Sequence, residues 1–315
     1  MELVMFVGIP ASGKSTHSAF YREQGYLVLS SDEIRNEITG GVDQESLSEK
    51  ERSRLHSQVF EIIRRQAVAA LKQGRSVVVD ATNLSRKRRM NFLAQFRHFD
   101  CRKKCVLFIT APEICLVRNR KRSGTARVPD SAIYRMLCGF ECPNYWEGWD
   151  EIVPAADPIP YRFPFEEIQG FDQDNPHHAL TLDEHIAQTV AFCREQGYGE
   201  RLERVAAYHD IGKRYTKRYC NARGIPTPHA HYLGHDSYGA YLYLAEMCCG
   251  KDLTEAQFRG ILYEANLINC HMRPLALWRK ETTTEEKDRS LFGEPFLTDL
   301  LALHRADRAA HQEAP

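Results

Sequence analysis

The sequence has few of the features that mark secreted or membrane proteins. No apolar run approaches the roughly 20 residues that cross a bilayer, so no membrane partner is expected. The segment before Gly8 has no basic stretch of the kind that opens a signal peptide. Ten cysteines are present, yet no two are spaced C-x-x-C, which argues against a zinc ribbon or a redox dithiol. Scattered thiols in such a chain are usually reduced, so we expect a cytoplasmic protein.

Net charge is also absent, but only as an average over the 315 residues, where 42 Lys and Arg match 42 Asp and Glu. Residues 1–150 hold 24 Lys and Arg against 17 Asp and Glu, a net +7, which leaves 18 against 25, a net −7, for the rest. Ten of the 13 histidines follow residue 175. A basic half is suited to a polyanion. An acidic, histidine-rich half is typical of a divalent-metal site.

Short apolar runs in the first half predict four β-strands, at residues 3–8, 26–30, 76–80 and 105–110. Polar segments with helical periodicity separate them, at residues 46–73, 85–98 and 112–122. Strands that alternate with helices predict an α/β domain built on a parallel sheet with helices on both faces.

The pattern changes after about residue 150. A proline-rich stretch begins at Val153 and reads as a linker. Beyond it the periodicity is helical, at residues 182–196, 199–212, 235–249, 254–267 and 294–310. We therefore expect an α/β domain over residues 1–152, a linker over 153–175 and an all-α domain over 176–315.

The segment from Gly8 to Ser15 fits the phosphate-binding pattern G-x-x-x-x-G-K-[ST], and it follows a predicted strand and precedes a predicted helix. Glycines let backbone N–H groups point into one concavity, where they bind phosphate oxygens together with the helix N-terminus. Lys14 would reach the β- and γ-phosphates of ATP, and Ser15 would hold Mg²⁺. The residues expected to contact the nucleotide in this loop are Gly8, Ala11, Ser12, Gly13, Lys14, Ser15 and Thr16.

A candidate acceptor site follows the second predicted strand. Ser30 and Glu33 have the spacing of a capping box, and Asp32 and Arg35 lie three residues apart on one helical face. Asp32 could take a proton from an acceptor hydroxyl, and Arg35 could hold a neighbouring phosphate. A polar first turn stabilised by the helix dipole explains the same residues equally well.

Two further groups of polar residues suit phosphoryl transfer. Asp80 ends the third predicted strand, where a second carboxylate near Mg²⁺ is expected, and Asn83 follows it. Arg118, Arg122 and Arg127 belong to a run of cations that a mobile lid could bring to the transferring phosphate. A solvated helix face is the alternative explanation for such a run.

Together these motifs resemble the 5′-hydroxyl polynucleotide kinase family over about 150 residues. The matching segments are Gly8–Ser15, Ser31-Asp32-x-x-Arg35, Asp80-Ala-Thr-Asn83, and Arg118-Asn-x-x-Arg122 with Val128-Pro129. The resemblance implies ATP and Mg²⁺ as cofactors, with Arg118 near the nucleotide. It also implies that Asp32 is the general base, that Arg35 contacts the phosphate on the 3′ side of the acceptor, and that Arg122 is a lid arginine.

The second half is centred on His209-Asp210, in the segment Ala-Tyr-His-Asp-Ile-Gly-Lys. Adjacent histidine and aspartate can bind one metal ion from a helix, with further ligands from His185 upstream and Asp307 near the C-terminus. Neutral imidazoles and carboxylates suit Mn²⁺, Co²⁺ or Ni²⁺. Surface or core positions are favoured for six other histidines, at 177, 178, 229, 231, 304 and 311.

This order of ligands resembles the HD phosphohydrolase superfamily, over roughly residues 176–310. By that resemblance His185, His209, Asp210 and Asp307 hold a first metal. His235 and His271 match positions that supply a second metal in members with two ions.

The two halves together resemble bifunctional enzymes that repair broken nucleic acids. A kinase would phosphorylate 5′-OH ends of RNA or DNA, and a metal-dependent phosphoesterase would remove a 3′-phosphate or a 2′,3′-cyclic phosphate, with a nucleic acid ligase as a further candidate partner. Two alternatives stay open. One is a small-molecule or nucleotide kinase with a nucleotide-cleaving domain, and the other is a nucleotide-sensing regulator without catalysis.

Overall fold

The computed structural model describes residues 1–42, 47–176, 179–278 and 283–311. The chain divides into two compact units. Unit 1 comprises residues 1–134, 143–159 and 248–250, and unit 2 comprises residues 135–142, 160–247 and 251–315. His177 and His178 lie outside the described residues.

Unit 1 is built on a parallel five-stranded sheet in the order β2-β3-β1-β4-β5. Its core includes Val4, Phe6, Val78, Val106 and Phe108, all buried. The central residues of these strands are apolar because helices cover both faces of the sheet, whereas β4 begins with three charged residues, Arg102 to Lys104. The strands are β1 (Glu2–Val7), β2 (Leu27–Ser30), β3 (Val77–Asp80), β4 (Arg102–Ile109) and β5 (Glu151–Ala156).

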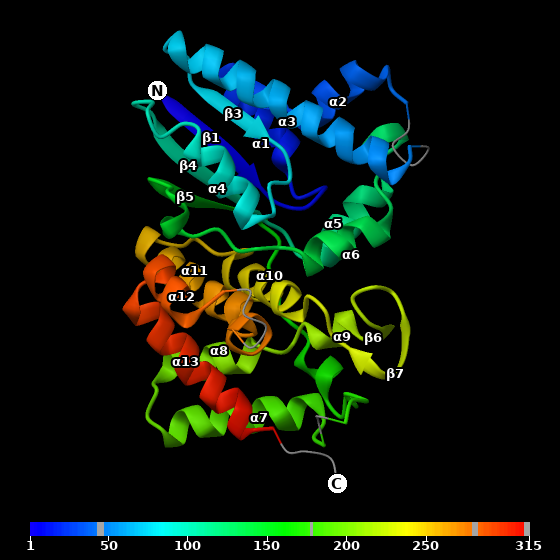
Figure 1. Cartoon of the computed structure of the whole chain (residues 1–315), viewed down its shortest axis with the longest axis vertical. Coiled ribbons are helices and arrows are strands. Elements are labelled where there is room, and N and C mark those ends of the chain that lie inside the picture. The colour runs from blue at the N-terminus through cyan, green and yellow to red at the C-terminus, as the bar shows by residue number, and fades with distance from the viewer. Residues whose placement is uncertain (43–46, 177–178, 279–282, 312–315) are drawn as a thin grey trace. The chain divides into compact units, whose positions relative to one another are not determined.

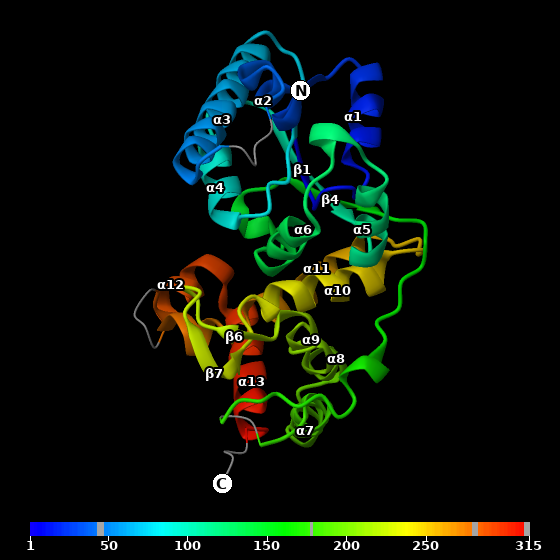
Figure 2. The same ribbon diagram turned by 90° about the vertical axis from the view of Figure 1, so that its right-hand side faces the viewer.

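Helices flank this sheet, and Figure 2 shows α3 and α4 on one side of it and α1 and α5 on the other. Ser48 begins the longest of them with a complete capping box to Glu51. The predicted parallel α/β arrangement is thus confirmed. The helices are α1 (Lys14–Glu23), α2 (Ser31–Thr39), α3 (Glu49–Lys72), α4 (Arg86–Ala94), α5 (Pro112–Arg120) and α6 (Asp130–Cys138), the last of which contributes residues to both units.

The structure differs from the expected linker over residues 153–175. Val153 to Ala156 continue β5, which pairs with β4 from Lys104 to Ile109. Pro154 is tolerated there because β5 is an edge strand, where one side of the backbone needs no partner. Residues 160–175 belong to unit 2.

Unit 2 is mainly helical (Figure 1). The expectation of an all-α domain is wrong in one respect, because a two-stranded antiparallel ribbon joins β6 (Arg218–Cys220) to β7 (Pro226–His231). The helices are α7 (Leu182–Glu195), α8 (Glu200–Tyr208), the single turn α9 (Lys213–Thr216), α10 (His235–Cys248), α11 (Glu255–Cys270), α12 (Glu285–Phe292) and α13 (Glu294–Ala309).

A segment from the first half of the sequence completes unit 2. The Asn269 side chain accepts a hydrogen bond from the Cys142 N–H at 2.9 Å and donates one to the Phe140 carbonyl at 3.1 Å. The Phe140 ring meets Tyr241 edge-on, with ring centroids 5.2 Å apart. Residues 135–142 are therefore part of the core of unit 2.

No helix in the described part of the chain is long and apolar enough to cross a membrane. All ten cysteines lie in that part, and none forms a disulfide.

Candidate active sites

The predicted phosphate loop joins β1 to α1 in unit 1. A Cβ at Gly8 would lie 2.7 Å from the Cβ of Phe108, so the loop can approach β4 this closely only with glycine there. Gly13 has φ +101°, a conformation that glycine adopts without strain, and it precedes α1 without a side-chain cap. No side chain of the capping residue therefore bonds the first N–H groups of α1. A phosphate site requires such N–H groups to be available to the phosphate oxygens.

Other residues of the loop stabilise its backbone conformation. Ala11 adopts φ +65°, and the buried Ser12 hydroxyl donates to the Ile9 carbonyl at 2.8 Å. Ser15 and Thr16 begin α1 with exposed side chains. The seven residues expected to contact the nucleotide therefore lie in the loop after β1 and in the first turn of α1.

Lys14 lies across this loop. Its Nζ donates to the Gly8 carbonyl at 2.9 Å and to the Ile9 carbonyl at 2.7 Å. Burial lowers the pKa of Lys14 to about 8, against the opposing effect of Asp80 and Asp32. Both carboxylates are thus near enough to act on the amine that is expected to meet the phosphates.

Asp80, at the end of β3, accepts a hydrogen bond from the Ser18 hydroxyl at 2.5 Å. Burial raises the pKa of this carboxyl, although Ser18 and Lys14 favour its ionised form. Asn83 follows with φ +46° and donates to the Phe6 carbonyl at 2.8 Å. Asp80, Ser18 and Lys14 therefore form one polar group beside the loop, and Ser18 was not predicted from the sequence.

Asp32 and Arg35 form an ion pair on α2, with 2.5 Å between Oδ1 and Nη1. The Asp32 side chain is 85% exposed, whereas that of Arg35 is 15% exposed. The carboxylate therefore faces solvent while the largely buried Arg35 fixes its position. Ser30 caps α2 by accepting from the Glu33 N–H at 3.3 Å. The reciprocal half of the expected capping box is wrong, because the Glu33 carboxylate instead binds Arg22 at 2.6 and 2.8 Å.

The cationic run forms α5 and the loop after it. Arg118 pairs with Asp157 at 2.5 Å, and the Asp157 side chain is 3% exposed. Arg122 is partly exposed, and its charge helps to lower the pKa of Lys14, which places it near the phosphate loop. Sequence reasoning missed Asp157, because that residue lies in the stretch assigned to a linker.

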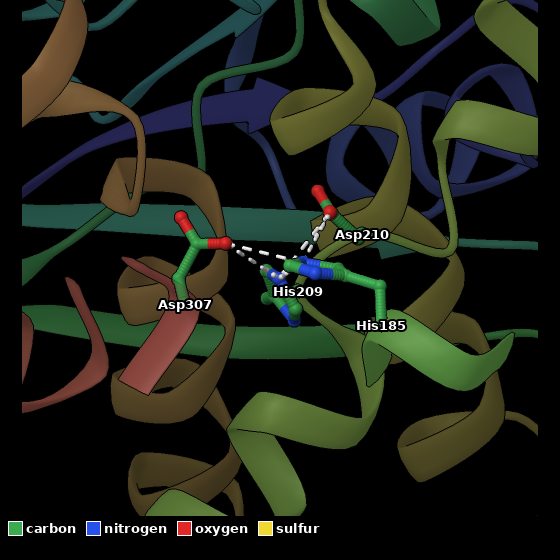
Figure 3. A group of neighbouring side chains, drawn as sticks. All are labelled: His185, His209, Asp210 and Asp307. Atoms are coloured by element: carbon green, nitrogen blue, oxygen red, sulfur yellow. Dashed lines mark hydrogen bonds and ion pairs between the residues drawn. The ribbon is translucent and has the colours of Figure 1, made fainter. Parts of the chain in front are cut away.

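In unit 2 the four residues of the predicted first metal site converge (Figure 3). His185 Nε2 lies 3.3 Å from Asp210 Oδ2 and 3.1 Å from Asp307 Oδ1. His209 Nε2 lies 3.3 Å from Asp210 Oδ2 and 3.6 Å from Asp307 Oδ1. All four residues are buried. Side chains from α7, the end of α8 and α13 thus meet at one point.

The predicted second pair, His235 and His271, approaches the other oxygen of the same aspartate. Asp210 Oδ1 lies 3.1 Å from His235 Nε2 and 3.6 Å from His271 Nε2. The two Nε2 atoms are 3.1 Å apart. Asp210 therefore divides its two oxygens between two groups of potential ligands.

Backbone hydrogen bonds orient three of these imidazoles. The Nδ1 atoms of His209, His235 and His271 lie 2.6 to 2.7 Å from main-chain carbonyl oxygens. A carbonyl only accepts, so each Nδ1 carries a proton, and each ring presents an Nε2 lone pair to the cluster whenever its Nε2 is unprotonated.

Two lone pairs that face each other repel unless a cation lies between them. Two ligands at ~2.1 Å from one ion lie roughly 3.0 Å apart at right angles and roughly 3.4 Å apart at the tetrahedral angle. The Nε2 atoms of His185 and His209 are 3.3 Å apart, and those of His235 and His271 are 3.1 Å apart. The donor set and its spacing therefore fit metal ions.

The charge balance of the cluster also favours cations. Burial alone would lower the pKa of His209, but Asp210 and Asp307 raise it to about 10. Burial would raise the pKa of Asp210, yet Lys213 and His209 hold it well below its usual range. Metal ions would replace the protons that these ligands otherwise bind.

The residues after Asp210 also shape the cluster. Lys213 Nζ lies 2.7 Å from Asp210 Oδ2 and 2.9 Å from Gln173 Oε1. A Cβ at Gly212 would lie 2.1 Å from the His235 carbonyl, so only glycine permits this approach. The spacing of three residues from Asp210, one helical turn, could have indicated Lys213 from the sequence.

His311 was expected at the surface or in the core, but it lies beside the cluster. Its Nε2 is 3.6 Å from Asp307 Oδ1, and its ring centroid is 5.2 Å from that of His185. The four-residue spacing from Asp307 on a helix would have pointed to this position.

Comparison with known families bears on the first part of the chain, most of which lies in unit 1. Residues 3–143 match the family model described as an AAA domain. The matched residues include the phosphate loop, Gly8–Ser15, and strands β2, β3 and β4. The match does not extend to the cluster of histidines and aspartates around Asp210 in unit 2, and no curated protein matches the chain.

Two solved structures are similar over 49% of this chain. One, from Chloroflexus aurantiacus, is described as a "putative kinase" and has 17% identity, with 84% of that chain covered and a TM-score of 0.39. The other, from Janibacter, is described as a sugar kinase and has 16% identity, with 85% covered and a TM-score of 0.38.

Proposed function

We propose that the chain is a bifunctional enzyme that phosphorylates 5′-OH ends of RNA or DNA and removes phosphate from their 3′ ends. The observation that carries the kinase part is the position of Asp32. Its carboxylate is exposed on the helix that follows β2, is held by Arg35, and acts electrostatically on Lys14 of the phosphate loop. A solvent-facing base beside a phosphate loop is accessible to an acceptor molecule that binds from the solvent.

The transfer step uses these residues in defined roles. Asp32 takes the proton of the acceptor hydroxyl while the oxygen of that hydroxyl attacks the γ-phosphorus of ATP. The bond between the γ-phosphorus and the oxygen that bridges it to the β-phosphate breaks, and ADP is released. Lys14 and Arg122 stabilise the charge that develops on the phosphate oxygens. Ser15 and Asp80 would hold Mg²⁺, which supplies charge neutralisation to the phosphates.

The residues of unit 2 support the phosphoesterase part. His185, His209, Asp210 and Asp307 would hold one divalent ion, and Asp210, His235 and His271 a second. Mn²⁺, Co²⁺ or Ni²⁺ suits this mixture of imidazole and carboxylate, and such an ion supplies Lewis acidity to a phosphate and lowers the pKa of water. Lys213 would offer its ammonium group to a phosphate oxygen.

One assay tests the proposal. Labelled ATP is offered to 5′-OH oligonucleotides of RNA and DNA, and in parallel to nucleosides and sugars. The same protein is given 3′-phosphate and 2′,3′-cyclic phosphate ends with Mn²⁺, Co²⁺ or Ni²⁺. Transfer to oligonucleotides and hydrolysis of the 3′ ends would support the proposal. Transfer to metabolites alone would establish a small-molecule kinase, and absence of both reactions would favour a nucleotide-sensing regulator.

A further inference from the structure

A second polar group, made of one cation and one histidine, lies on the acceptor side of unit 1. The guanidinium Nη1 of Arg88, on α4, is 3.0 Å from the Nε2 of His56, on α3. A guanidinium group has no acceptor, so Nε2 of His56 accepts and its ring proton lies on Nδ1. The pair therefore presents only donors, from Nδ1 and the remaining guanidinium N–H groups, to any incoming ligand.

The topology places this pair near the proposed acceptor base. Strands β2 and β3 are parallel neighbours, with Ser30 opposite Asp80. Helix α2 carries Asp32 and Arg35 and begins where β2 ends, and α4 begins shortly after β3 ends. Both helices thus start at the carboxyl edge of the sheet, where ligands bind in open α/β sheets. Figure 2 shows α4 beside α3 on this side of unit 1.

The charges of α4 are unfavourable for the helix itself. Its first turns carry four consecutive cations, from Arg86 to Arg89, where the helix dipole favours acidic residues. Arg86 and Arg89 are buried and face Glu147. Arg88 is exposed, and no carboxylate in the described part of the chain lies within ion-pair distance of it.

His56 has the surroundings of an anion site rather than of an ion pair. Burial, Arg88 and Arg35 all lower its pKa, so the cations of α2 and α4 both act on this ring. Its ring centroid lies 4.7 Å from that of Phe60, which is partly buried one helical turn further on. Cations beside an aromatic pair are characteristic of surfaces that bind single-stranded nucleic acid.

We propose that Arg88 and His56 bind a second backbone phosphate of a polynucleotide acceptor, beyond the phosphate that Arg35 would hold. This inference rests on the proposed kinase function and specifies it. A nucleoside 3′-monophosphate reaches Arg35 alone, whereas a longer 5′-OH strand reaches both places. The enzyme should therefore prefer acceptors that carry at least two phosphates.

The test compares KM for three acceptors: a nucleoside 3′-monophosphate, a 5′-OH dinucleotide with a 3′-phosphate and a 5′-OH trinucleotide with a 3′-phosphate. In the wild type, KM should fall roughly tenfold on addition of the second phosphate, the effect of a charge-assisted contact. Arg88→Ala should abolish most of that gain, and Arg88→Lys should restore part of it. The salt dependence of acceptor KM should weaken by roughly 0.7 in log–log slope in Arg88→Ala.

Arg75→Ala is the matched control. Arg75 is an exposed arginine just before β3, at the amino ends of the strands rather than at their carboxyl ends. Its replacement by alanine removes the same charge as Arg88→Ala without touching the site. Equal effects of Arg88→Ala and Arg75→Ala on acceptor KM would overturn the inference. A rise in the KM for ATP alone in Arg88→Ala would overturn it as well. A wild type that phosphorylates no oligonucleotide would overturn the proposed function itself.

Discussion

The lowered pKa of Lys14 makes ATP affinity depend on pH in a defined direction. Burial places this pKa at about 8. Bound phosphates stabilise the ammonium form, so an enzyme with a neutral Lys14 must take up a proton when ATP binds. Affinity for ATP should therefore level off below about pH 7 and should fall as the pH rises through 8.

The magnitude follows from the proton equilibrium. At pH 9.5 only about 3% of Lys14 would be protonated before ATP binds, compared with about 90% at pH 7. If the amine stays charged in the complex, the Kd for MgATP rises about 30-fold between these pH values. That change corresponds to about 2 kcal/mol of binding free energy.

Isothermal titration calorimetry with MgATP at pH 7.0, 8.0, 8.75 and 9.5 measures this change. Repeating each titration in buffers of different ionisation enthalpy counts the proton that is taken up. Lys14→Arg is the control, because its guanidinium stays charged throughout and should bind with a flat pH profile. A Kd that is constant to pH 9.5 in the wild type, without proton uptake, would refute the reasoning.

Three further predictions concern single substitutions. Asp32→Ala should abolish phosphate transfer and leave ATP binding intact, since the residue is assigned to the acceptor; nucleotide titration and a transfer assay check both. Asp210→Ala should lower the metal content of the protein, measured by mass spectrometry after chelation and reloading, and should silence 3′-phosphate removal while the kinase, supplied with Mg²⁺, stays active. Glu147→Ala should destabilise the fold by about 3–5 kcal/mol in denaturant unfolding, because it leaves the fully buried Arg89 guanidinium unpaired.

Each of these has an outcome that would count against it. Wild-type turnover in Asp32→Ala would remove this residue from the chemistry. Full metal content in Asp210→Ala would mean that the histidines bind the metal ions without the carboxylate of Asp210. Unchanged stability in Glu147→Ala would show that Arg89 finds other acceptors, beyond its bonds to the Asn83 and Leu84 carbonyls.

The parts of the fold that follow a local pattern could be predicted from the sequence. Each of the first four strands contains an apolar run, and the glycines of the phosphate loop permit its backbone conformation. Strand β5 could not be recognised, because Pro154 is unfavourable in most strands and is acceptable only at an edge. That error also removed Asp157 from consideration, although it pairs with the predicted Arg118.

For the cluster around Asp210, the sequence predicted that His185, His209, Asp210 and Asp307 converge, and it did not predict how the oxygens of Asp210 are divided. The adjacent pair His209-Asp210 is a local signal, and the resemblance supplied His185, His235, His271 and Asp307. Only the packing of helices distant in sequence shows that the two oxygens of Asp210 face different histidines. The ribbon of β6 and β7 was missed because β6 has only three residues and β7 contains two prolines, Pro226 and Pro228.

The interleaving of the chain between the two units has a practical consequence for dissecting the protein. A fragment that starts at residue 160 would lack residues 135–142, leaving the Asn269 amide without the Cys142 and Phe140 backbone groups that it bonds. A fragment that ends at residue 159 would lack Cys249 and Gly250, which bond the Ile109 and Asp157 carbonyls in unit 1. No single cut therefore yields both units whole, and the two reactions are better separated by point substitutions in the full chain than by expressing its halves.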